Sequence, residues 1–265
     1  MEAVRYRSIM SEDIKEDRME SADRTHFGFH EIARNEKVGL VRSVFDSVAP
    51  RYDLMNDLMS GGVHRIWKAA LIDWLRPTAH MELLDVAGGT GDVALGFRKA
   101  GGGKATICDI NEQMVSHGRD RAMDHGVFHG INWCVGDAEN LPMPDCSVDA
   151  YTIAFGLRNV TEPQKALMEA YRVLKPGGRF LCLEFSHVVI PWLAEVYDRY
   201  SFSVLPQLGH WVGKDRGAYQ YLAESIRKFP QQAELASMMQ NSGLELVSWR
   251  NLTCGVVAIH SGWRL

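Results

Sequence analysis

Five short apolar runs, separated by segments with helical periodicity, are the feature that most constrains the fold. They are MELLDVA, KATICDI, INWCVG, VDAYTIAFG and GRFLCLEF, at residues 81–87, 104–110, 131–136, 148–156 and 178–185. Continuous apolar runs of this length are typical of strands buried on both faces of a parallel sheet. Helical patterns lie between them at 91–100, 111–124 and 162–174, the last followed by the helix stop LKPGG. This alternation predicts a doubly wound parallel sheet.

The segments before and after this core have different patterns. Between residues 36 and 49, and again between 66 and 74, apolar residues recur at the spacing of one helix face, so we expect a helical cap over 27–80 before the core at 81–186. The aromatic-rich region 187–230 is interpreted as a lid insertion over the substrate, with added core packing as the alternative reading. A helix and two antiparallel strands close the chain at 231–265. Together these elements predict an α/β fold: a doubly wound, Rossmann-like, seven-stranded mixed sheet with an N-terminal helical cap.

Composition limits the partners and the compartment. Residues 1–26 mix acids and bases with few large apolar side chains, which predicts a mobile tail outside the single domain 27–265. A net charge of −4 argues against nucleic acid as a partner. The five cysteines are far apart and form no CxxC pair, which indicates free thiols in a reducing compartment and no metal site.

The stretch LLDVAGGTGD, residues 83–92, lies where ligands bind in open parallel sheets, directly after the first buried strand. Gly89, Thr90 and Gly91 approximate a dinucleotide fingerprint, and Asp109 ends the next strand at a distance suited to gripping ribose hydroxyls. A nicotinamide-dependent oxidoreductase is therefore one alternative.

Charge favours a different ligand. Asp85 and Asp92 flank the glycines, and a pyrophosphate beside them would be repelled, whereas the sulfonium and ammonium groups of S-adenosylmethionine would be attracted. The backbone at Gly89 would then approach the methionine part, and Asp109 would still hold the ribose. Asp137 follows the third strand and is positioned to accept a hydrogen bond from the adenine amino group, unless it only caps a turn.

Motifs along nearly the whole chain from residue 27 resemble the ubiquinone/menaquinone biosynthesis C-methyltransferases, a branch of the class I S-adenosylmethionine-dependent enzymes. The most specific motifs are YDLMNDLMS at 52–60 and FGLRNV at 155–160, while the glycine loop and LKPGG belong to the wider class. The resemblance implies that Thr90, Asp109, Asp137 and Ala138 contact the cofactor, and that Tyr52, Arg158 and Asn159 line the reaction site. The family often has serine immediately before FGLRN, where this chain has Ala154.

Methylating a ring carbon requires an electron-rich quinol, which becomes nucleophilic as a hydroxyl loses its proton. Arg158 is expected to favour that phenolate electrostatically, although without the resemblance a surface salt bridge would be the favoured reading. Asn159 is expected to orient a hydroxyl or a water, and Tyr52 to contact the ring. A relayed water is our preferred proton acceptor.

The resemblance also implies a polyprenyl tail on the substrate, drawn from a bilayer. We expect helices within 36–75 and 190–225 to form an apolar entrance that touches the membrane surface. The expected location is the cytoplasm at the inner membrane rather than the mitochondrial matrix, with a homodimer or a complex of quinone-pathway proteins as possible assemblies. Benzoquinol, naphthoquinol or both remain open as substrates, and a non-catalytic quinone-binding scaffold is a further alternative.

Overall fold

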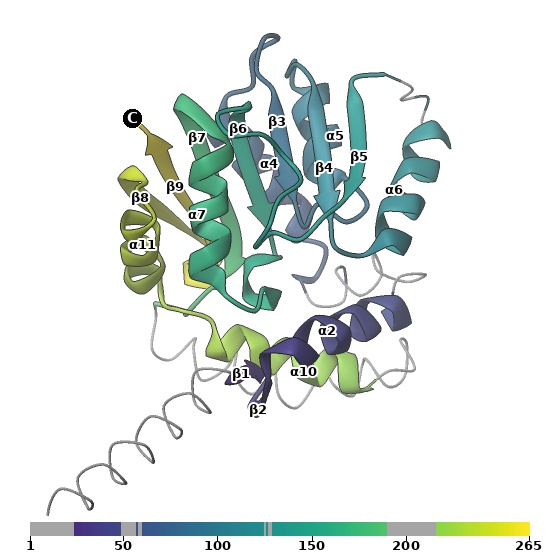
Figure 1. Ribbon diagram of the computed structural model, residues 1–265, viewed down its shortest axis with the longest axis vertical. Helices are drawn as coiled ribbons and strands as arrows, with labels where there is room; N and C mark the ends of the chain where they lie inside the picture. The colour runs from purple at the N-terminus through teal and green to yellow at the C-terminus, as the bar shows by residue number, and fades with distance from the viewer. Residues whose placement is uncertain (1–23, 49–56, 58–59, 125, 127–128, 190–215) are drawn as a thin grey trace, which may run out of the picture.

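A computed structural model of the chain describes residues 24–48, 57, 60–124, 126, 129–189 and 216–265. One seven-stranded sheet runs through it in the order β5-β4-β3-β6-β7-β9-β8 (Figure 1). The strands are β3 (Leu83–Val86), β4 (Ala105–Asp109), β5 (Ile131–Val135), β6 (Val148–Ala154), β7 (Leu174–Phe185), β8 (Glu245–Leu252) and β9 (Val257–Arg264). The first five are parallel, and β9 is antiparallel to both of its neighbours. The predicted doubly wound mixed sheet is confirmed.

Helices cover both faces of the sheet. On one face, α4 (His64–Leu75) and α5 (Asp92–Lys99) pack against the strands, with Trp67, Leu71 and Phe97 among the buried side chains. On the other face are α7 (Pro163–Val173) and α11 (Gln232–Asn241), which bury Leu167 and Met239. Helix α6 (Glu112–Asp124) contacts β4 and β5 near the sheet edge. Both core clusters meet strand residues, so the apolar runs are buried on both sides, as their composition predicts.

The order of the strands reverses beside β3. β4 and β5 extend from one side of β3, whereas β6 and β7 extend from the other. The loops that leave β3 and β6 therefore diverge at the carboxyl ends of these neighbouring strands, which opens a crevice there. Helices α2 (Arg34–Val48) and α10 (Arg216–Lys228) lie side by side across this end of the sheet (Figure 1).

The N-terminal region differs from the expected purely helical cap. A two-stranded hairpin of β1 (Arg24–Phe27) and β2 (His30–Ala33) precedes α2, and β1 begins inside the range predicted to be a mobile tail. Strands of four residues are too short to show a readable alternation. Gly28 makes the turn with φ of +59°, a conformation that favours glycine. The hairpin is held to α10, since the backbone N–H of Phe29 donates to Glu224 at 3.1 Å.

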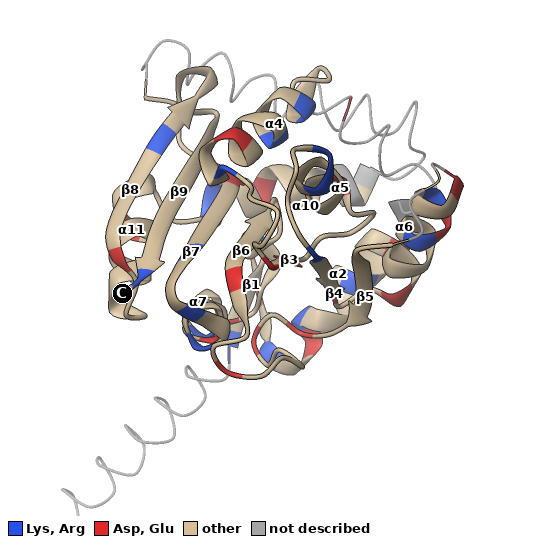
Figure 2. Cartoon of the chain, turned by 90° about the horizontal axis from the view of Figure 1, so that it is seen from above, with Lys and Arg blue, Asp and Glu red and all other residues tan. Residues whose placement is uncertain are grey.

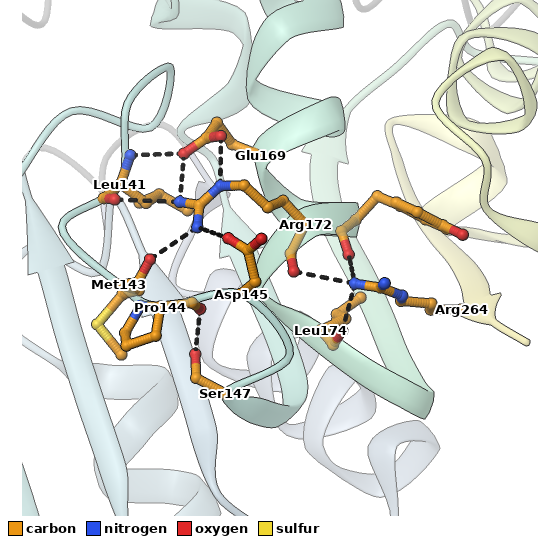
Figure 3. Close-up of polar contacts among 10 residues, drawn as sticks. Leu141, Met143, Pro144, Asp145, Ser147, Glu169, Arg172, Leu174 and Arg264 are labelled. Carbon is orange, nitrogen blue, oxygen red and sulfur yellow. Dashed lines mark hydrogen bonds and ion pairs between the residues drawn. The ribbon is translucent and has the colours of Figure 1, made fainter.

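The LKPGG segment follows α7 as predicted, but its residues already belong to β7. Figure 3 shows the hydrogen bonds and ion pairs that two arginines, Arg172 and Arg264, make where α7 ends and β7 begins. Arg264 donates to the carbonyl oxygens of Tyr171, Arg172 and Leu174 at 2.8, 2.9 and 2.8 Å. Arg172 pairs with Glu169 and with Asp145, at 2.7 and 2.6 Å. Two carbonyls in the last turn of α7, those of Tyr171 and Arg172, are thereby satisfied although they have no partner within the helix.

Charged residues of both signs are interspersed over the described surface (Figure 2). None of the helices in the described ranges is both long and apolar enough to cross a membrane.

Candidate functional site

A cavity opens at the switch point, between the carboxyl ends of the strands and helix α2. Loops after β3, β4, β5 and β6 form its floor, and α2 forms its roof. The lining residues are Val38, Val41, Arg42 and Phe45 of α2, with Val86, Ala87, Gly89, Asp109, Ile110, Asn111, Met114, Gly136, Asp137, Ala138, Glu139, Phe155, Gly156, Asn159, Val160 and Thr161. Five of the nine site residues expected from sequence therefore lie in one cavity: Gly89, Asp109, Asp137, Ala138 and Asn159.

Asp109 joins two of the loops. Its Oδ2 accepts a hydrogen bond from the backbone N–H of Gly89 at 2.8 Å, and its Oδ1 accepts one from the N–H of Asn111 at 2.9 Å. Burial raises the pKa of this carboxyl, while these backbone donors act in the opposite direction. Each carboxylate oxygen has a second acceptor position, so the anchored side chain can also accept bonds from a diol.

The loop after β5 carries Asp137, the residue that the sequence predicts to contact adenine. The Oδ1 of Asp137 accepts a hydrogen bond from the N–H of Glu139 at 2.9 Å, so the side chain does cap a turn. It also lines the cavity, as does the buried Ala138. The two readings considered for Asp137 are thus compatible, because capping orients the carboxylate along the cavity wall.

Asp85 and Thr90 line a smaller hollow beside the main cavity, which shares Ala87 and Phe155 with it. Asp85 is fully buried, and its Oδ1 accepts a bond from the Thr152 hydroxyl at 2.7 Å. Its Oδ2 has no hydrogen-bond partner among the described residues. Burial is the main cause that raises the pKa of Asp85 to about 7. A buried acceptor without a partner, beside a glycine loop, is suited to a ligand that carries an ammonium group.

The surroundings of Asp92 contradict the expectation that both Asp85 and Asp92 attract a cationic ligand. Its Oδ2 is 2.8 Å from Nζ of Lys68, and its Oδ1 pairs with Arg121. These two cations, which outweigh burial, lower its pKa to about 2. Arg121 also donates to the Thr90 hydroxyl at 3.3 Å. The carboxylate of Asp92 is therefore compensated, and of the two residues only Asp85 keeps a buried oxygen without a hydrogen-bond partner among the described residues.

Arg158 does not line the main cavity. Its side chain is 5% exposed and pairs with Glu184, which is 2% exposed. It also donates to the carbonyl oxygen of Phe155 at 2.8 Å and lies over the Phe185 ring. This is a buried ion pair, not the surface salt bridge considered from sequence. One donor, Nε, is buried with no partner among the described residues.

Sequence reasoning missed Glu184, although it ends a buried strand. Its Oε1 also accepts the N–H of Phe185 at 2.9 Å, so the carboxylate is held by backbone as well as by Arg158. Burial raises the pKa of Glu184, and Arg158 opposes that effect. The predicted sheet already contained a signal for Glu184. β6 and β7 are parallel neighbours, so their carboxyl ends lie together, with Glu184 near the end of β7 and Arg158 just after β6.

Asn159 connects the cavity to α10. Its Oδ1 accepts a hydrogen bond from the Tyr221 hydroxyl at 3.1 Å, and Tyr221 stacks on Phe27 with the ring centroids 4.1 Å apart. The α10 part of the predicted lid thus contacts the predicted reaction site. Tyr52 and most of the YDLMNDLMS motif lie outside the described residues.

Helix α2 is fastened to the loops beneath it by polar contacts that the sequence did not reveal. Lys37 donates to the carbonyl oxygen of Val160 at 2.9 Å, and Arg42 to that of Ile110 at 3.3 Å. The side-chain amide of Asn111 donates to Asp46 at 2.7 Å. Burial is the main cause that lowers the pKa of Lys37 to about 8.

Comparison with known proteins identifies the family of the chain. The profile of the ubiE/COQ5 methyltransferase family matches residues 31–264. The ubiquinone/menaquinone biosynthesis C-methyltransferase UbiE of Cereibacter sphaeroides is 53% identical over 93% of this chain and 99% of its own length. The protein of the same name from Paracoccus denitrificans is 55% identical over 91% and 97%.

Among solved structures, an S-adenosylmethionine-dependent methyltransferase of Thermotoga maritima matches with a TM-score of 0.62 at 18% identity, covering 85% of this chain and all of that one. At that identity the match concerns the fold alone. The family profile and the bacterial relatives go further: the chain belongs to the ubiE/COQ5 methyltransferase family.

Proposed function

We propose that this protein transfers a methyl group from S-adenosylmethionine to a ring carbon of a polyprenylated benzoquinol, naphthoquinol or both, in ubiquinone or menaquinone biosynthesis. The observation that carries the proposal is a switch-point cavity, in a chain of this family, lined by the residues expected to hold the cofactor. The family argues against the alternative function, a nicotinamide-dependent oxidoreductase. The charge of Asp92 does not add to that argument, because Lys68 and Arg121 compensate it.

The residues present fit the cofactor. The buried, unpartnered oxygen of Asp85 suits the ammonium group, and the anchored carboxylate of Asp109 suits the ribose hydroxyls. Asp137 and Ala138 lie where the adenine ring would bind, with Met114 as an apolar neighbour. Gly89, with φ of +53°, allows the backbone to approach the ligand closely. Thr90 supports the loop through Arg121.

The cofactor supplies an electrophilic methyl group on a cationic sulfur, and the protein must orient and activate the acceptor ring. Asn159 lines the cavity and orients a ring hydroxyl, because Tyr221 holds its side-chain oxygen. Arg158 favours the phenolate by its charge and by holding the carbonyl oxygen of Phe155, a residue of the cavity wall, while Glu184 fixes the guanidinium. A water accepts the proton, and Tyr52 contacts the ring. Holding the two carbon centres in line supplies the proximity contribution to catalysis.

The apolar roof of the cavity is the proposed path of the polyprenyl tail. Val38, Val41 and Phe45 face the cavity, whereas Leu40 on the same helix is 38% exposed and Phe29 of the hairpin is 51% exposed. Exposed apolar side chains beside such an entrance favour peripheral contact with a bilayer. We place the protein in the cytoplasm at the inner membrane, as a homodimer or within a quinone-pathway complex. Flotation with liposomes tests the contact, and absence from the lipid fraction in every lipid mixture rejects it.

The decisive experiment measures transfer of label from methyl-labelled S-adenosylmethionine to short-tailed benzoquinol and naphthoquinol analogues, side by side. Label in either product supports the proposal and identifies the ring. Thermal denaturation with S-adenosylmethionine or NAD separates the rival readings, since a ligand of the native state raises the midpoint. Stabilisation by NAD alone, with no labelled product, would reject the methyltransferase. Binding of the cofactor and quinol without turnover would indicate the scaffold.

A further inference from the structure

Three arginines converge on a hollow at the end of the sheet opposite the cofactor cavity. The hollow is lined by Trp74, Leu75, Arg76, Met81, Arg179, Arg250 and Trp263. Met81 precedes β3, and Arg179 pairs with Ala150 near the start of β6. These positions mark the amino ends of the parallel strands, whereas the cofactor cavity lies at the carboxyl ends.

Aromatic walls hold the arginines in place. The guanidinium of Arg179 lies 5.4 Å from the Trp74 ring centre and 4.9 Å from that of Trp263. Arg250 lies 4.1 Å from the Trp74 ring centre. Arg179 is also fixed by donation to Ser261 at 3.0 Å and to the Trp74 carbonyl oxygen. Stacking of this kind orients a guanidinium while its edge donors stay available.

The cluster has no anionic counterpart among the described residues. None of the three arginines forms an ion pair there, in contrast to Arg121, Arg158 and Arg172, which all pair with carboxylates. Burial lowers the pKa of Arg179, and its charged neighbours Arg250 and Arg76 lower it further. Like charges brought together without compensation repel one another, and a bound anion would relieve that repulsion.

We infer that this hollow binds a phosphate group. Three positive charges match a phosphate, which carries about −1.5 to −2 at pH 7, better than a single carboxylate. The guanidinium fork supplies paired donors for its oxygens. The source is either a free phosphate or diphosphate or the headgroup of an anionic phospholipid. This site is separate from the methyl-transfer site and does not depend on the proposed function.

The test uses the double variant Arg76→Gln/Arg250→Gln in the full chain. Both arginines are exposed and donate no side-chain hydrogen bond within the described residues, so the fold should be retained, which circular dichroism checks. The matched control is Arg119→Gln/Lys165→Gln, which removes the same charge from exposed positions on α6 and α7. Calorimetry measures binding of inorganic phosphate and pyrophosphate at constant ionic strength. Co-sedimentation compares vesicles of phosphatidylcholine with and without phosphatidylglycerol.

Binding of either free anion to wild type and control, weakened at least tenfold in the test variant, supports a free phosphate ligand. Binding to phosphatidylglycerol vesicles alone, lost in the test variant and kept in the control, supports a lipid headgroup. The inference is overturned when neither probe binds, or when control and test variants lose binding equally. Methyl transfer by the test variant should stay within twofold of wild type, so failure here is distinguishable from failure of the proposed function.

Discussion

The buried pair of Arg158 and Glu184 allows the most demanding test of the site. Replacing Glu184 by Gln keeps the side-chain shape but leaves the guanidinium without its anion, at a position where both side chains are almost fully buried. Breaking a buried ion pair from one side costs about 3–5 kcal/mol. For a chain of this size, each kcal/mol corresponds to roughly 2–4 °C, so we expect the melting temperature to fall by roughly 10 °C.

The double variant Arg158→Met/Glu184→Gln separates pairing from simple loss of polar groups. It removes both charges at once, so its cost should fall below the sum of the single variants by at least ~1 kcal/mol. Chemical denaturation of Arg158→Met, Glu184→Gln and the double variant measures this coupling. Additive costs would refute the view that the two side chains act as one unit.

Measurements of kcat on the same variants test the role of this ion pair in catalysis. Glu184→Gln retains the arginine but removes the group that positions it, so kcat should fall while the Kd for S-adenosylmethionine changes little, because neither residue lines the cofactor cavity. Arg158→Ala should behave in the same way. An equal loss of turnover and of cofactor affinity would contradict the roles assigned to both residues.

Three further predictions concern the cofactor loops. The pKa of Asp85 is raised from 3.8 to about 7, so folding favours its protonated form and the free energy of unfolding should fall by up to about 4 kcal/mol as pH rises through that window. About 3 kcal/mol of this decline falls above pH 5, so urea unfolding at pH 5 and pH 8 should show it in the wild type and not in Asp85→Asn; an equal decline in both proteins would count against it. Asp109→Ala should weaken S-adenosylmethionine binding at least tenfold by calorimetry, since it removes the ribose acceptor and the anchor of Gly89; unaltered affinity would reject that role. Gly91→Ala should cost ~1–3 kcal/mol in thermal denaturation, because φ is +83° and an added Cβ would lie 2.8 Å from Ile107 and Trp133; a wild-type midpoint would disprove the strain.

The order of strands and helices along the chain could be predicted from the sequence because it depends on local patterns. Apolar runs and helical spacing located the seven strands and the helices between them to within a few residues, apart from β7, which begins four residues earlier than expected. The position of LLDVAGGTGD after the first central strand then placed this loop beside the switch-point cavity, since the carboxyl ends of parallel strands share one edge. The hairpin of β1 and β2 escaped prediction because each strand has only four residues.

What surrounds each charged side chain was decided by the tertiary structure. Asp85 and Asp92 look equivalent in the sequence, yet one is buried with a raised pKa and the other is compensated by Lys68 and Arg121 from two other helices. Arg158 acquires Glu184 from the neighbouring strand, and α2 closes over loops far along the chain. The sequence alone determined the order of the elements and the position of the glycine loop at the end of the first central strand, because periodicity and glycine turns are local. Ion pairing, burial and the roof of the cavity depend on contacts between segments that are distant in the sequence. The energies of such contacts cannot be inferred from the pattern of any one segment.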